Sequence, residues 1–134
     1  MDIKDRILYE DNHLIIVNKE VGELSQGDQS GDPTLVDTIK GYLKKAYNKP
    51  GNVYLGVVHR LDRPTSGAIV YAKTEKALSR LNELFRTDAV EKSYWAVVDK
   101  VPPKEHGVLE HYLIKDAKAN KSRAVSKNRS GAKL

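Results

Sequence analysis

The stretch VYLGVVHRLDRPTSGAIVYAK, residues 53–73, contains two apolar runs separated by the polar motif HRLDRPTSG, residues 59–67. Runs rich in Val, Ile and Tyr are typical of strands, whereas Pro-Thr-Ser-Gly is typical of a turn. The stretch therefore predicts two strands joined by a loop that contains the motif. A histidine, two arginines and an aspartate in such a loop are costly to bury unless they are paired or take part in chemistry.

Strand and helix patterns are interleaved on both sides of this stretch. HLIIVNK, residues 13–19, predicts a strand, and apolar residues at three- and four-residue spacing predict amphipathic helices near 34–48 and 74–87. Alternation in VEKSYWAVVDK, residues 90–100, and GVLEHYLIK, residues 107–115, predicts two further strands. The predicted fold class is α+β, with a mixed, largely antiparallel sheet flanked by helices.

Composition limits the size and the class of the protein. The chain has 134 residues, of which 40% are hydrophobic, and this suffices for one modest core. Cysteine is absent, which excludes disulfides and thiolate metal sites, and no window approaches the ~18 apolar residues of a membrane span. We expect a single domain over residues 1–115 in a monomeric, cytoplasmic protein that is not attached to a membrane.

The basic residues are concentrated at the end of the chain. Residues 115–134 contain seven Lys or Arg and a single Asp, while the rest of the sequence is close to neutral. A basic segment with Ser, Asn and Gly but without apolar periodicity predicts a flexible tail, here residues 116–134. Contact with nucleic-acid phosphates is the alternative interpretation.

Asp62 is the motif residue best suited to chemistry. A carboxylate can act as a nucleophile, a base or an electrostatic anchor, and the adjacent Arg60 and Arg63 would keep it ionised. From local chemistry alone, the same residues also fit an ordinary turn with solvated arginines, and His59 fits a histidine of the core. The motif positions that suit phosphate or sugar contacts, as well as a turn, are Thr65, Ser66 and Gly67.

The segment HRLDRPTSGAIVYAKT, residues 59–74, resembles the central motif of the RluA-type RNA pseudouridine synthases, H-R-L-D-x-x-T-S-G followed by an apolar strand and A-K. DNHLIIVNKEVG, residues 11–22, resembles the opening segment of that family, and EKSYWAVV, residues 91–98, resembles its K-x-Y segment. The resemblance covers roughly residues 7–115. Glu20 stands where the family usually has proline, which we expect to loosen the entry to the following loop.

The resemblance implies a role for each matched residue. Asp62 would attack the target uridine during its isomerisation to pseudouridine, and Tyr94 would stack on the base and take the proton from C5. Arg60 would enter the RNA stack in place of the flipped nucleotide. The implied partner is structured RNA, either rRNA or tRNA, and neither a cofactor nor a metal is implied. The residues expected to bind substrate are His59, Arg60, Arg63, Thr65, Ser66, Gly67 and Lys92.

One feature of the family is not found in the sequence. Members continue into strands with a T-G-R-x-H-Q-I-R-like motif, whose basic residue pairs with the catalytic aspartate. We therefore expect an incomplete catalytic domain whose turnover lies well below that of a complete relative. A binding-only RNA module is one alternative. A hydrolase with Asp62 as covalent nucleophile is another, disfavoured because no second carboxylate, phosphate loop or metal set is placed to assist.

Overall fold

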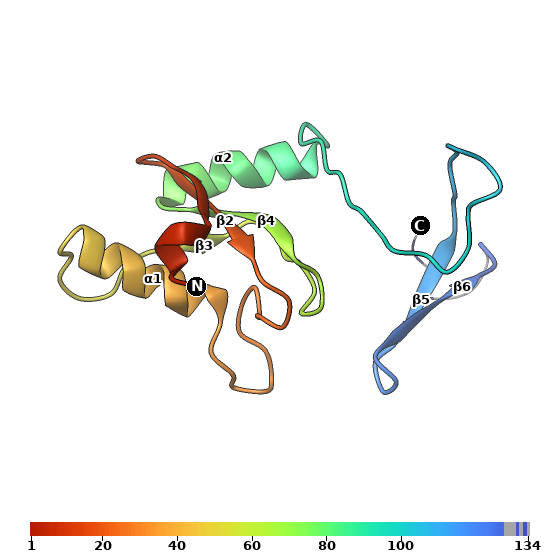
Figure 1. Ribbon diagram of the computed structural model, residues 1–134, viewed down its shortest axis with the longest axis horizontal. Helices are drawn as coiled ribbons and strands as arrows, with labels where there is room; N and C mark the ends of the chain where they lie inside the picture. Colours follow the sequence, from red (N-terminus) through yellow and green to blue (C-terminus); the bar gives the residue numbers. More distant parts are fainter. Residues whose placement is uncertain (128–130, 132, 134) are drawn as a thin grey trace. The chain divides into compact units, whose positions relative to one another are not determined.

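The computed structural model describes residues 1–127, 131 and 133, which form two compact units (Figure 1). The first unit is Met1–Ser93 and the second is Tyr94–Leu134. The division between the units therefore precedes the predicted domain boundary at residue 115.

A four-stranded antiparallel sheet forms the centre of the first unit. The strand order is β1-β2-β4-β3, and every pair of neighbours is antiparallel. A short 3-10 helix, Ile3–Arg6, precedes the first strand. The bounds of the strands are β1 Ile7–Glu10, β2 Leu14–Lys19, β3 Gly56–Val57 and β4 Gly67–Ala72. The predicted strands at 13–19 and after the motif are thus confirmed, whereas the apolar run before the motif forms a strand only over Gly56–Val57.

Two helices flank this sheet, as predicted. Helix α1, Leu35–Ala46, begins after Thr34, whose side chain accepts a hydrogen bond from the Asp37 N–H as part of a capping box. Helix α2, Glu75–Arg86, begins after Thr74, which accepts from the Ala77 N–H. Neither helix of the described chain is long and apolar enough to cross a membrane. The α+β fold with a largely antiparallel sheet and two helices is confirmed.

The core lies between α1 and one face of the sheet. In the antiparallel register, Ile15 of β2 lies opposite Tyr71 of β4, so alternate residues of the two strands share a face. Helix α2 runs along the opposite side of the sheet in Figure 1. Its Leu78 packs so closely on Gly56 that a Cβ there would lie 3.0 Å from Leu78 Cδ1. The fully buried core residues are Ile15, Val17, Leu35, Ile39, Leu43, Ile69 and Tyr71.

The second unit contains one hairpin, in which β5, Tyr112–Asp116, pairs with β6, Lys121–Val125, in antiparallel register. The strand predicted over 107–115 forms only in its second half. The strand predicted over 90–100 is wrong, because the structure has no strand there and Trp95 and Val97 are fully exposed. Alternating residues make a strand only where a neighbouring backbone supplies hydrogen bonds.

Part of the predicted tail, residues 116–134, is folded into this hairpin, because β6 lies within it. The sequence does not reveal β6 because its residues, KSRAV, are mostly polar. The flexibility of the tail stays a prediction, and residues 128–130, 132 and 134 lie outside the described residues.

Candidate active site

The motif loop, residues 58–66, joins β3 to β4 and contains Asp62. It lies against residues 19–25, which begin with the last residue of β2 and are called the supporting segment. The two meet because Lys19, the last residue of β2, is paired in register with Gly67, the first residue of β4. Segments more than 30 residues apart in sequence are thereby brought to the same end of the sheet.

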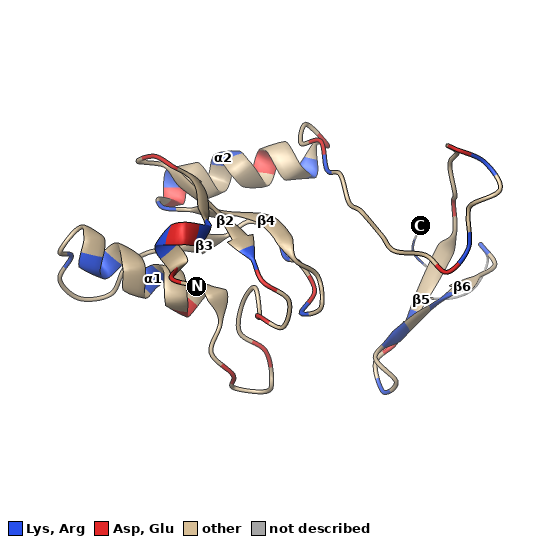
Figure 2. Cartoon of the chain, viewed as in Figure 1, with Lys and Arg blue, Asp and Glu red and all other residues tan. Residues whose placement is uncertain are grey.

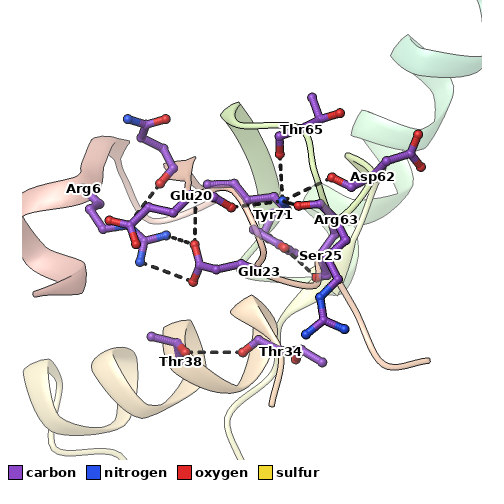
Figure 3. A network of polar contacts seen from close by, with 12 residues as sticks. Arg6, Glu20, Glu23, Ser25, Thr34, Thr38, Asp62, Arg63, Thr65 and Tyr71 are labelled. Atoms are coloured by element: carbon purple, nitrogen blue, oxygen red, sulfur yellow. Dashed lines mark hydrogen bonds and ion pairs between the residues drawn. The ribbon is translucent and has the colours of Figure 1, made fainter. Parts of the chain in front are cut away.

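Lys19 binds the backbone of the motif loop from the interior. Its side chain is fully buried, and its Nζ donates to the carbonyl oxygens of Asp62 at 3.2 Å, Arg63 at 3.1 Å and Thr65 at 2.7 Å. A fourth carbonyl, that of Glu20, lies 3.1 Å away. Burial lowers the pKa of Lys19, and the charges of nearby carboxylates oppose this change. The ammonium therefore draws three carbonyl groups of the loop toward one point (Figure 3).

Ser25 and Gly22 of the supporting segment also bind the backbone of the loop. The Ser25 Oγ donates to the Leu61 carbonyl at 2.7 Å and accepts from the Leu61 N–H at 3.0 Å. The Gly22 N–H donates to the Arg63 carbonyl at 2.8 Å. Backbone groups on both sides of Asp62 are thus hydrogen-bonded to the supporting segment.

Glu20, where the family usually has proline, contributes to the supporting segment through its own backbone. The Glu20 N–H donates to the carboxylate of Glu23 at 2.8 Å. Glu23 in turn forms an ion pair with the buried Arg6. Proline has no N–H and could not make this bond. A proline at position 20 would therefore lose the hydrogen bond to Glu23 that holds the entry to the loop.

The Asp62 carboxylate is left free by this network. Asp62 is exposed, and its side chain points away from the hydrogen-bonded residues in Figure 3. The ion pairs of the described residues do not include it. Arg63 instead pairs with Asp32 at 3.0 Å and donates through Nε to the Gly22 carbonyl at 2.9 Å. The structure thus directs the Arg63 guanidinium to Asp32 rather than to Asp62, and Arg60 is exposed. The expectation that the two arginines keep Asp62 ionised stays a prediction.

His59 is packed between the sheet and α2. Its Nε2 accepts a hydrogen bond from the Val70 N–H at 3.0 Å, and its ring stacks on Phe85 with 4.7 Å between the centroids. Burial, with the charge of Lys92 as a second cause, lowers the pKa of His59 and favours the neutral ring that this hydrogen bond requires. The Lys92 Nζ lies 5.9 Å from the Phe85 centroid. The imidazole thus packs the loop against α2, and its Nε2 already accepts a hydrogen bond within the protein.

The remaining predicted residues have different surroundings. Thr65 donates its N–H to the Asp62 carbonyl at 2.9 Å, which closes the turn, and Ser66 is exposed. Gly67 has a φ of +134°, a conformation that other residues rarely adopt, while no atom lies within 4 Å of a Cβ built there. Its backbone conformation, rather than close approach, explains the glycine. Tyr94 is exposed and begins the second unit, so its contact with Asp62 stays a prediction.

Comparison with known proteins identifies the family. The family model described as RNA pseudouridylate synthase matches residues 13–134. This chain belongs to that family. The ribosomal large subunit pseudouridine synthase C of Buchnera aphidicola is 33% identical over 130 residues, which cover 97% of this chain and 40% of that protein. The mitochondrial pseudouridylate synthase RPUSD4 of Mus musculus is 33% identical over 109 residues, which cover 81% of this chain and 29% of that protein.

A solved structure supports the same assignment. Human RNA pseudouridylate synthase domain containing 4 superimposes with a TM-score of 0.78 at 26% identity, over 98% of this chain and 51% of that one. The fold described above is therefore that of a pseudouridylate synthase domain. The chain spans about 40% of the length of the Buchnera relative, and the motif loop lies within the matched residues.

Sequence reasoning on this pseudouridylate synthase chain does not identify the residues that hold the motif loop. In the sequence, Lys19 is noted only as part of the opening segment that resembles the family. Strand alternation nevertheless places Lys19 on the same face as the buried Ile15 and Val17. That periodicity is the available signal for a buried lysine. No comparable signal exists for Ser25, which lies in a loop and is buried by contacts with residues distant in sequence, such as Leu61.

Proposed function

We propose that this chain provides the catalytic aspartate of an enzyme that isomerises uridine to pseudouridine in structured RNA. The observation that supports it most directly is the exposed Asp62 carboxylate on a loop whose backbone is bound by Lys19 and Ser25. A carboxylate whose backbone is held before substrate arrives has less conformational entropy to lose in reaching the attacking geometry. Among the described residues it also has no ion pair that would have to break first.

The proposed reaction is balanced without a cofactor. The Asp62 carboxylate attacks C1′ of the target uridine as the bond between N1 and C1′ breaks. The base turns, and C5 forms a bond to C1′ as the bond between C1′ and the carboxylate oxygen breaks. N1 then takes up a proton and the proton of C5 is lost. Tyr94 is proposed to accept that C5 proton and to stack on the base. Arg60 is proposed to fill the place of the flipped nucleotide, because extruding a base costs a few kcal/mol that new stacking can offset.

The loss of the C5 hydrogen gives a direct test. RNA transcripts labelled with tritium at C5 of uridine release label only where a uridine is isomerised. Large-subunit ribosomal RNA is the first substrate to test, because the Buchnera relative is named for it, and tRNA is the second. The measurement is made with protein in excess over RNA, so that one slow turnover per molecule suffices.

Two variants make this test specific. Asp62→Asn should abolish tritium release, because an amide of the same shape cannot act as the nucleophile. Asp88→Asn is the matched control, because Asp88 is exposed and has a φ of 54°, which asparagine tolerates. Release that survives in Asp62→Asn, or none from the unaltered chain, would overturn the proposal.

A binding-only RNA module is the second candidate. Figure 2 shows basic residues on the hairpin of the second unit, and those within β5, β6 and their turn are Lys115, Lys118, Lys121 and Arg123. Such a module would bind RNA with an affinity that falls steeply with salt, is unchanged in Asp62→Asn and is accompanied by no tritium release.

A further inference from the structure

We propose that Ser25 is a positioning residue for the Asp62 carboxylate, and that the buried Tyr71 hydroxyl holds Ser25 in place. The inference rests on the proposed function for its catalytic consequence. Its structural part concerns the chain alone and can be tested separately.

Two peptide groups flank the Asp62 Cα, and both are hydrogen-bonded. The first joins Leu61 to Asp62, and its carbonyl accepts from the Ser25 Oγ at 2.7 Å. The second joins Asp62 to Arg63, and the Asp62 carbonyl accepts from Lys19 at 3.2 Å and from the Thr65 N–H at 2.9 Å. Because both peptide planes are fixed, the backbone dihedrals of Asp62 are fixed as well. The direction in which the carboxylate leaves the backbone follows from them.

Ser25 fits this task because one hydroxyl satisfies two backbone groups. It accepts from the Leu61 N–H at 3.0 Å while it donates to the Leu61 carbonyl. Both residues are buried, with 4% and 8% of their surface exposed, so water is a poor substitute. In the described part of the chain, the hydrogen bonds of these two Leu61 groups go to Ser25. Alanine at position 25 would leave both of them without a partner.

Tyr71 ties this serine to the sheet. Its hydroxyl donates to the Ser25 carbonyl at 2.7 Å from the fully buried face of β4 (Figure 3). Burial, with the charge of Glu23 as a second cause, raises the pKa of Tyr71, so that the hydroxyl keeps its proton and can donate. Strand β4 thereby holds Ser25 in place, and Ser25 in turn holds the motif loop.

The structural part is tested by backbone ¹⁵N order parameters of the isolated chain. We expect the order parameters of Asp62 and Arg63 to fall in Ser25→Ala and, less strongly, in Tyr71→Phe, while those of α2 stay unchanged. Ser25→Thr keeps the hydroxyl and should retain wild-type order. Thr38→Ala and Tyr42→Phe are matched controls, because they remove hydroxyls that bind Thr34 and Glu10, away from the loop. Unchanged order at Asp62 in both test variants would overturn the inference.

The catalytic part is tested by tritium release under single-turnover conditions. In Ser25→Ala the maximal rate should fall by about 10²-fold, as for a misplaced reacting group. The protein concentration that gives half-maximal rate should change less than about twofold, because RNA contacts are not removed. Tyr71→Phe, which keeps the ring volume, should lower the rate by about threefold to tenfold, the effect of one hydrogen bond.

The outcomes separate the two proposals. A change confined to the half-maximal concentration, or equal losses in the controls, would overturn the positioning role. If the order parameters fall as expected but the unaltered chain releases no tritium, the proposed function fails while the positioning of Asp62 by Ser25 is upheld. If Ser25→Ala does not fold, Tyr71→Phe decides by the same two measurements.

Discussion

Lys19 shows how a lysine can be buried on carbonyl oxygens rather than on a carboxylate. Among the described residues its Nζ is bonded to four carbonyl groups, three of them in the motif loop. Removing an ammonium from water costs several kcal/mol, and this arrangement offsets the cost by satisfying the donors with charge-assisted hydrogen bonds. The hydrogen bonds that offset the cost of burying Lys19 are thus the same bonds that order the motif loop.

Replacing this lysine should therefore destabilise the first unit. In Lys19→Met the Thr65 carbonyl loses its donor, and the carbonyls of Asp62, Arg63 and Glu20 each keep only a backbone N–H. We expect the free energy of unfolding to fall by about 3 kcal/mol. Urea denaturation measures this change. Lys45→Met is the matched control, since Lys45 is an exposed residue of α1, and its effect should stay within about 0.5 kcal/mol. Equal effects of the two substitutions would contradict the role assigned to Lys19.

Gly67 gives a second prediction for a single residue. Its φ of +134° is unfavourable for any residue with a Cβ, although the space around it is open. Gly67→Ala should lower the free energy of unfolding by about 1–3 kcal/mol through backbone strain. Gly41→Ala, in the interior of α1 with equally open space, should instead be neutral or stabilising by up to about 1 kcal/mol, which thermal unfolding would show.

At the scale of elements, one carboxylate joins a strand, a helix and the end of a second strand. Glu10 of β1 accepts hydrogen bonds from Tyr42 at 3.0 Å and from Tyr47, the residue after α1, at 2.6 Å. It also accepts from the Nζ of Lys73, which follows β4, at 2.6 Å. Only 12% of the Glu10 side chain and 8% of the Lys73 side chain are exposed. Glu10 thus links α1 to the sheet, and the lysine of the A-K pair in the motif neutralises its charge.

This cluster makes the stability of the first unit depend on pH. Burial alone would raise the pKa of Glu10, but hydrogen bonds from Lys73, Tyr47 and Tyr42 outweigh it, so the pKa lies below its ordinary value of 4.5. A lowered folded-state pKa stabilises the fold above pH 4.5, and this stabilisation is lost as the pH falls through the lowered pKa. We expect Glu10→Gln to lower the free energy of unfolding at pH 7 by about 1–3 kcal/mol.

The measurement is urea denaturation between pH 7 and pH 3. The difference between wild type and Glu10→Gln should shrink as the pH falls below 4.5. Glu91→Gln, at an exposed position, serves as the control and should follow wild type throughout. A difference that is constant with pH would show that Glu10 acts through packing instead.

The elements differ in how far the sequence predicts them. Both helices are predicted with nearly correct ends, because capping threonines and apolar periodicity act locally. Strand β1 is not predicted, because its four residues, ILYE, follow a charged start. The prediction of a strand at 90–100 is wrong because the alternation of apolar and polar residues cannot reveal whether a neighbouring strand exists. Asp62 is recognised from its motif, whereas Ser25 depends on a contact across 36 residues.

At the scale of the whole molecule, charge is distributed unevenly along the chain. Residues 115–134 contain seven of the 23 Lys and Arg, and several of these lie on the hairpin of the second unit. Positive groups that neutralise RNA phosphates release counterions, so affinity falls as salt rises. The hairpin is therefore expected to contribute affinity for RNA without selecting a sequence.

A triple substitution tests this expectation. Lys118→Gln, Lys121→Gln and Arg123→Gln together should make the slope of log affinity against log salt less steep, by up to about 0.7–0.9 for each phosphate that is no longer neutralised. Lys40→Gln, Lys44→Gln and Lys45→Gln on α1 remove the same charge and should change the slope less. Filter binding to ribosomal RNA between 50 and 200 mM salt, roughly the range over which such slopes are resolved, measures both. Equal slopes for the two triple variants would contradict a specific role for the hairpin.

The pairing of Lys19 with Gly67 also determines when the motif loop can become ordered during synthesis. The residues that hold the loop precede it, but the strand that brings the two together, β4, follows it. Helix α1 depends on local contacts and forms in about a microsecond, whereas synthesis adds only roughly 5–20 residues per second, so α1 can form before β4 has been made. A nascent chain that has emerged only as far as Pro64 contains Asp62, Lys19 and Ser25, yet it lacks the strand that sets them side by side. The backbone of Asp62 therefore takes its final conformation only after residues 67–72 have left the ribosome and paired with β2.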